Sequence, residues 1–98
     1  MSSSAPTLGR TLLDYADAIR DQCGVECFMK PMLSSYVVRV PSHRWGVLVT
    51  PCGTTSYKAA SLAEGGVWYP LNCRSDLEDW LVVQYATLLV RVTDSKGN

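Results

Sequence analysis

Two runs of β-branched and aromatic residues, SYVVRV at 35–40 and WGVLVT at 45–50, constrain the fold more than any other feature of the chain. Such residues favour extended strands. The connection between the runs, residues 41–44, has the length of a hairpin loop. Pro41 and Pro51 bracket the second run, where each lacks the N–H that a strand ladder needs. The sequence therefore predicts an antiparallel hairpin at the centre of the molecule.

Three further runs have strand character, namely VECFM at 25–29, SYKAAS at 56–61 and VWYPL at 67–71. The first is expected to end against Pro31, which would break a ladder. The small residues at 63–66 supply a turn between the last two runs. Together with the central hairpin, these runs predict an antiparallel sheet of four or five strands, connected as a meander.

The segment before the strands has the periodicity of an amphipathic helix. Between residues 7 and 23, apolar side chains recur at steps of three and four, from Leu8 to Cys23, so they share one face. Thr7 is the expected N-cap, and Gly24 stands where a left-handed residue often ends a helix. The sequence therefore predicts a helix over residues 7–23.

A second helix is expected from about residue 76 to 92. Ser75 and Glu78 have the spacing of a capping box, in which each side chain satisfies a backbone amide of the other. Apolar residues cover more than one side of this segment, so we expect either that the sheet wraps the helix or that a second side meets a partner. The β-branched residues in TLLVRVT leave an alternative, in which residues 87–93 form a last strand.

These elements predict one domain, because 98 residues suit a single core. The expected fold class is α+β, an antiparallel sheet of four or five strands flanked by an N-terminal and a C-terminal helix packed on one face. The domain is expected to span residues 7–93, between a disordered tail at 1–6 and a frayed tail at 94–98. The other face of the sheet is expected to be exposed.

Charge and hydropathy argue against several classes of partner. Nine basic and nine acidic residues cancel, which gives no general attraction for nucleic acid or an anionic membrane. The longest apolar-rich stretch, residues 81–92, is interrupted by Gln84 and Arg91 and falls short of the ~20 residues of a membrane span. Without an export signal at the N-terminus, we expect a cytoplasmic protein with reduced cysteines.

The lone histidine and the cysteines are the candidates for reactive chemistry. His43 and Cys52 lie at opposite ends of the 45–50 strand, ~25–30 Å apart at ~3.3 Å per residue, too far for a catalytic dyad. Cys23 and Cys27 form one close pair, whereas structural zinc sites usually present two. The sequence therefore predicts no catalytic, cofactor-binding or metal site, and a zinc-binding or thiol-dependent protein stays as an alternative.

Aromatic and basic side chains of the strands are expected to form a partner-binding surface, because exposed Trp, Tyr and Arg are typical of interface hot spots. In VWYPL, Trp68 and Tyr69 must face opposite sides of a strand, so one of them is expected in solvent. The predicted partner-binding residues are Tyr36, Arg39, Arg44, Trp45, Tyr57, Trp68 and Tyr69. The predicted homodimer interface on the last helix consists of Trp80, Val83, Ala86 and Val90.

The function that these observations favour is a non-enzymatic module that binds another protein. Small α+β chains of this kind are common among phage and mobile-element proteins that inhibit a host complex, including the anti-CRISPR proteins. That similarity is one of size and layout. The alternative is a single-stranded nucleic-acid-binding domain, with Arg39, Arg44 and Lys58 as cations and Trp45 or Tyr57 as stacking platforms.

Overall fold

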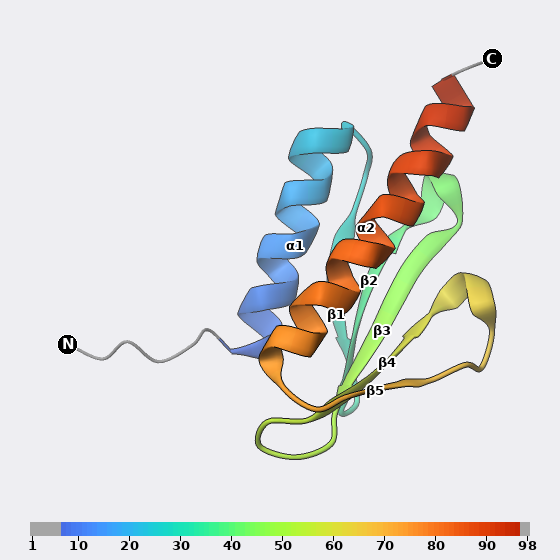
Figure 1. The fold of residues 1–98 in the computed structure, drawn as a ribbon. Coiled ribbons are helices and arrows are strands. Elements are labelled where there is room, and N and C mark those ends of the chain that lie inside the picture. Colours follow the sequence, from blue (N-terminus) through green and yellow to red (C-terminus); the bar gives the residue numbers. More distant parts are fainter. Residues whose placement is uncertain (1–6, 97–98) are drawn as a thin grey trace.

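The computed structural model describes residues 7–96, which form two helices and a five-stranded antiparallel sheet of order β1-β2-β3-β4-β5. Figure 1 shows both helices on the same face of the sheet, which confirms the predicted α+β class. In chain order the elements are α1 (Leu8–Cys23), β1 (Phe28–Met32), β2 (Ser35–Val40), η1 (Pro41–His43), β3 (Trp45–Pro51), β4 (Tyr57–Ser61), η2 (Leu62–Glu64), β5 (Tyr69–Leu71) and α2 (Arg74–Lys96).

Helix α1 begins and ends at the residues that the sequence indicated. The Thr7 hydroxyl accepts a hydrogen bond from the Arg10 amide at 3.2 Å, which satisfies one of the free amides of the first turn. Gly24 adopts a left-handed conformation with φ 65° and donates its N–H to the Arg20 carbonyl at 3.1 Å. Between these caps, Leu12 and Ile19 are fully buried against the sheet.

The core lies between the helices and the covered face of the sheet. Alternate residues of β2 and β3 point into it, so Val38, Val47 and Val49 have no exposed surface. Each such side chain contributes roughly 1.5–3 kcal/mol through burial. Trp45 is 1% exposed, and its indole Nε1–H donates to the Gln84 carbonyl at 3.2 Å and to Thr87 Oγ1 at 3.1 Å. These two hydrogen bonds attach α2 to the central strand.

The edge strands differ from the prediction. Strand β1 starts three residues later than expected and contains Pro31, which pairs in register with Tyr36. Strand β5 covers residues 69–71 rather than 67–71 and contains Pro70. A proline is tolerated at both places because an edge strand is paired on one side and needs only half of its amides. Both edges of the sheet therefore carry a proline.

Helix α2 also differs at both ends. It begins at Arg74, so the predicted Ser75 capping box is wrong; instead, the Asp76 carboxylate accepts the Asn72 amide at 3.2 Å. Residues 87–93 are helical rather than a strand, and the helix continues to Lys96, past the predicted domain end. The predicted tail at 1–6 and residues 97–98 lie outside the described part of the chain. Within residues 7–96, neither helix combines the length and apolar composition that crossing a membrane requires.

Candidate functional site

The face of the sheet that the helices leave open carries three rows of side chains running across the strands. The rows follow from the antiparallel register, because directly paired residues point to the same side of a sheet. The rows are Phe28, Arg39 and Gly46; Lys30, Val37, Leu48 and Ala60; and Met32, Ser35, Thr50, Lys58 and Pro70, in which a 2.7 Å hydrogen bond joins the Ser35 and Thr50 hydroxyls. We call this surface the open face, and count Leu62 and Trp68, which flank it, as part of it.

A shallow hollow of about 390 Å³ lies on the open face. Its floor includes Val37, which is only 5% exposed although no helix covers it. Phe28, Met32 and Leu62 stand around this floor with exposed fractions of 38%, 51% and 42%. Exposed apolar side chains gathered around a depression are typical of interaction surfaces.

Gly46 lets the sheet and η2 approach each other at the margin of this hollow. A Cβ atom at residue 46 would lie 2.5 Å from Leu62 Cδ1 and 3.1 Å from the Val38 carbonyl oxygen. A larger residue at this position would push Leu62 away from the sheet. Because Gly46 has no side chain, Leu62 can lie close to the sheet and form one wall of the hollow.

Three cations surround the apolar side chains of the open face. Lys30 and Arg39 border the hollow, and both are exposed. Lys58 lies in the neighbouring row, with its Nζ 5.0 Å from the ring centroid of Trp68. This cation–π contact restrains both side chains on the open side of the molecule. The open face thus combines apolar contact area with positive charge.

The neutral net charge of the chain conceals a strong division of charge along the sequence. Between Glu26 and Glu64 there are four Lys or Arg residues and no Asp or Glu, so this segment has a net charge of +4. The remainder has five basic and nine acidic residues, which gives −4. Strands β1 to β4 lie in the acid-free segment, whereas both helices carry exposed acidic residues. Strands β1 to β4 and the segments that join them therefore carry a net charge of +4, whereas each helix carries −1.

The tip of the β1–β2 hairpin extends the apolar surface beyond the sheet. The register pairs Met32 with Ser35, which leaves Leu33 and Ser34 as a two-residue turn. Leu33 has φ 56° and is fully exposed. Left-handed backbone is unfavourable for a bulky residue, and hairpin turns of this kind usually use Asn or Gly. Leu33 therefore adopts an unfavourable backbone conformation without burying its side chain.

The structure brings few of the predicted partner-binding residues together. Arg39 lies on the open face and Trp68 at its margin, while Arg44 is exposed at the β2–β3 connection. Trp68 and Tyr69 face opposite sides, as predicted: Trp68 is 41% exposed, and Tyr69 packs under α2 with its ring 6.3 Å from that of Trp80.

Two of the predicted contact residues belong to the core instead. Trp45 is 1% exposed and Tyr57 is 8% exposed, so neither is available to a partner protein or as a stacking platform for bases. Tyr36 is half-buried and turned toward α1, where a Cβ atom on Gly9 would lie 3.4 Å from its ring. The predicted partner-binding role of Trp45 and Tyr57 is therefore wrong, and Tyr36 does not share a face with Arg39.

The alternation of side chains along a strand could have predicted that these rings are buried. Tyr36 and Arg39 are three residues apart in one strand, and Tyr57 and Lys58 are adjacent, so the members of each pair must face opposite sides. If Arg39 and Lys58 face solvent, then Tyr36 and Tyr57 must face the core. The same rule, once β1 is placed at 28–32, finds Phe28, which the sequence analysis missed. The acid-free segment was a second signal in the sequence.

The predicted dimer interface is a surface of α2. Val83 and Val90 are 57% and 60% exposed, and Ala86 between them is also exposed. Trp80 is half-buried because its ring packs on Tyr69. Self-association through these residues stays a prediction.

The groups considered for reactive chemistry are separated. His43 ends η1 and bonds to Ser42, whereas Cys52 follows β3 and contacts the Thr50 carbonyl, so the whole of β3 separates them. Burial raises the pKa of Cys27 to about 11, which keeps this thiol protonated and unreactive at neutral pH. Among residues 7–96, no three His, Cys, Asp or Glu side chains gather as a metal site.

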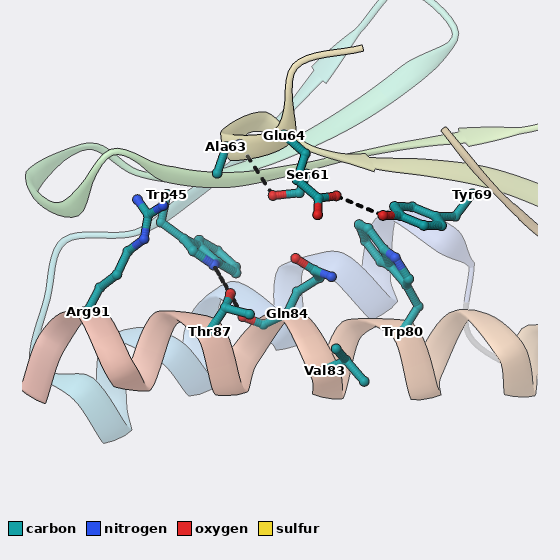
Figure 2. A pocket seen from close by; sticks show the side chains of 10 residues that line it. All are labelled: Trp45, Ser61, Ala63, Glu64, Tyr69, Trp80, Val83, Gln84, Thr87 and Arg91. Atoms are coloured by element: carbon teal, nitrogen blue, oxygen red, sulfur yellow. Dashed lines mark hydrogen bonds between the residues drawn. The ribbon is translucent and has the colours of Figure 1, made fainter. Parts of the chain in front are cut away.

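A second cavity, of about 420 Å³, lies on the other side of the sheet between α2 and the strands. Figure 2 shows Trp45 and Trp80 at its two sides, with Gln84 between them. Comparison of the chain with family models, with curated proteins and with solved structures finds no match.

Proposed function

We propose that this protein is a non-enzymatic binding module that takes an acidic, apolar segment of another protein on its open face. The observation that carries the proposal is the coincidence of the acid-free segment with the exposed apolar hollow. A partner with both properties buries apolar area against Phe28, Met32 and Leu62 and places its carboxylates beside Lys30 and Arg39. Charge complementarity of this kind increases association rates and excludes basic partners.

The edges of the sheet favour docking across the face rather than addition of a strand. A partner strand that pairs with an edge needs a regular row of free amides and carbonyls. Pro31 in β1 and Pro70 in β5 each remove one amide from such a row. The exposed side chains of the open face are therefore the better contact surface.

The nucleic-acid alternative is weakened because the two aromatic rings predicted to stack on bases are buried. A single-strand binder needs several exposed aromatic platforms along a basic groove. Trp45 and Tyr57 are core residues, and the exposed aromatic side chains of the open face are Phe28 and Trp68. Phosphate contacts are available from Lys30, Arg39 and Lys58, so the experiment must include a nucleic acid.

The test is selection of peptides from a displayed random library by the purified chain, followed by titration of the synthesised winners. We expect the selected peptides to be enriched in Asp and Glu beside Leu, Ile or Phe. Lys30→Gln and Arg39→Gln should each weaken binding by about three- to tenfold, because a close charge pair is lost. Arg10→Gln removes the same charge from an exposed position on α1 and should leave the affinity unchanged.

Two outcomes would contradict the proposal. One is selection of basic or uncharged peptides, or of peptides whose affinity responds equally to Arg10→Gln and Arg39→Gln. The other is binding of a single-stranded oligonucleotide such as oligo(dT), weakened by Lys30→Gln and steeply by salt, in the absence of any selected acidic peptide. The second result would indicate that the open face binds nucleic acid instead of a protein segment.

A further inference from the structure

The cavity beneath α2 contains polar groups that the fold itself does not use. Ten side chains line it, and most of the polar ones are engaged within the protein. The Trp45 indole donates to α2, the Ser61 hydroxyl accepts the Ala63 amide at 3.3 Å, and Thr87 bonds to the Gln84 carbonyl at 2.7 Å. These interactions are structural and leave the cavity open.

The two charged side chains at the cavity are also occupied. The Glu64 carboxylate accepts the Tyr69 hydroxyl at 2.9 Å. The Arg91 guanidinium donates to the carbonyl oxygens of His43 and Arg44, both at 2.9 Å. One guanidinium and one carboxylate together give the cavity no net charge, so it favours a neutral molecule over an ionic one.

Gln84 is the exception among these polar residues. The residue is 9% exposed, and among the side chains of residues 7–94 its carboxamide has no hydrogen-bond partner. No enclosed side-chain nitrogen or oxygen in the described chain lacks a partner, so this carboxamide must reach the space of the cavity. Figure 2 shows it directed away from α2, between Trp45 and Trp80. The carboxamide therefore offers a free donor and a free acceptor to a molecule that enters the cavity.

The walls beside Gln84 suit a flat molecule. Trp80 and Tyr69 form one wall, with ring centroids 6.3 Å apart and planes inclined by 45°. Trp45 closes the opposite side. A volume of about 420 Å³ is within the range of small-molecule sites.

We propose that the cavity between α2 and the sheet binds a small, neutral, planar aromatic or heteroaromatic molecule that presents a hydrogen-bond donor and acceptor side by side, as carboxamides, lactams and nucleobases do. The Gln84 carboxamide forms hydrogen bonds with that donor and acceptor, and the aromatic rings of Trp80 and Tyr69 contact the flat face of the molecule. The site is on the opposite side of the sheet from the open face, so it is independent of the proposed protein partner.

The test is titration of the full chain, labelled with ¹⁵N, with benzamide as the probe. We expect binding in the millimolar range, which is usual for a ligand this small, with shifts of the Gln84 side-chain NH₂ and the Trp80 indole signals. The Trp68 indole, on the open side of the molecule, should not move. N,N-dimethylbenzamide keeps the ring and loses the donor, so it should bind about five- to tenfold more weakly.

A pair of variants completes the test. Gln84→Leu removes the carboxamide at nearly constant volume and should abolish the preference for benzamide over its dimethyl analogue. Gln22→Leu makes the same exchange on α1, next to Tyr85, and should leave benzamide binding unchanged. Equal binding of the two probes to the unmodified chain, shifts confined to Trp68, or no shift with either probe would each overturn the proposal. The probe comparison needs no variant, so it decides even if Gln84→Leu does not fold.

Discussion

Leu33 has an unusual combination of backbone and side chain, a left-handed φ of 56° and full exposure at the β1–β2 turn. We predict that Leu33→Asn raises the free energy of unfolding by about 1 kcal/mol, because Asn adopts this conformation at lower cost. The same change should weaken the peptides selected on the open face, since it removes exposed apolar area. Urea unfolding and peptide titration measure the two effects.

Leu33→Ala is the matched control, because alanine shortens the side chain but retains the unfavourable backbone conformation. It should weaken peptide binding without stabilising the fold. If both substitutions change stability equally, the left-handed conformation is not the cause.

Cys27 gives the protein a specific sensitivity to alkali. Its pKa is raised from 9.0 to about 11, mainly by burial, so the folded state favours the protonated thiol. The resulting contribution to stability is complete below pH 9 and is lost as the pH rises toward 11. We predict that the free energy of unfolding falls in this interval by an amount on the order of 2 kcal/mol.

Chemical denaturation at a series of pH values measures this fall. Cys27→Ala should make the decline shallower, and Cys52→Ala, at an exposed position, should leave it unchanged. Burial also raises the pKa of Tyr15, so part of the decline should remain in the Cys27 variant. An identical profile for Cys27→Ala and the unmodified chain would contradict the assignment to this thiol.

Among the elements, those with local signals were predictable and those shaped by tertiary contacts were less so. Helix α1 has a cap at each end and one apolar face, and its bounds match the sequence pattern. The start of α2 is set by distant partners: the Arg74 guanidinium donates to the Tyr57 hydroxyl at 3.1 Å and to Thr11 Oγ1 at 2.8 Å. No local pattern in the sequence reports such contacts. For this reason the sequence pattern placed the N-cap at Ser75, although the helix begins at Arg74.

Helix α2 also carries the prediction of self-association. Val83 and Val90 expose more than half of their surface on one side of the helix, which suits an isologous contact with a second copy. We predict that sedimentation velocity at micromolar concentration gives twice the 10.8 kDa mass of one chain. Val83→Glu should shift the protein toward monomer by placing like charges at the interface.

Leu13→Glu is the control for this experiment, since Leu13 is 41% exposed but lies on α1. It adds the same charge outside the predicted contact. A clean monomer of 10.8 kDa for the unmodified chain would remove the dimer.

At the scale of the whole molecule, the class of fold followed from the sequence, but the composition of the binding surface did not. The order of helices and strands could be predicted because hydrophobic periodicity is a local property. The open face depends on which side each strand turns outward, and a shift of three residues in β1 was enough to hide Phe28. The division of charge was visible in the sequence and was obscured by the net charge of zero.

The two edge prolines have a consequence for how the protein behaves when it is concentrated. A sheet with an apolar open face and free edges is at risk of stacking edge to edge into fibrils. Pro31 and Pro70 interrupt the row of amides at each end of this sheet, so a neighbouring chain finds no continuous template on which to grow. The molecule therefore exposes an apolar face while the prolines at its edges disfavour assembly into amyloid.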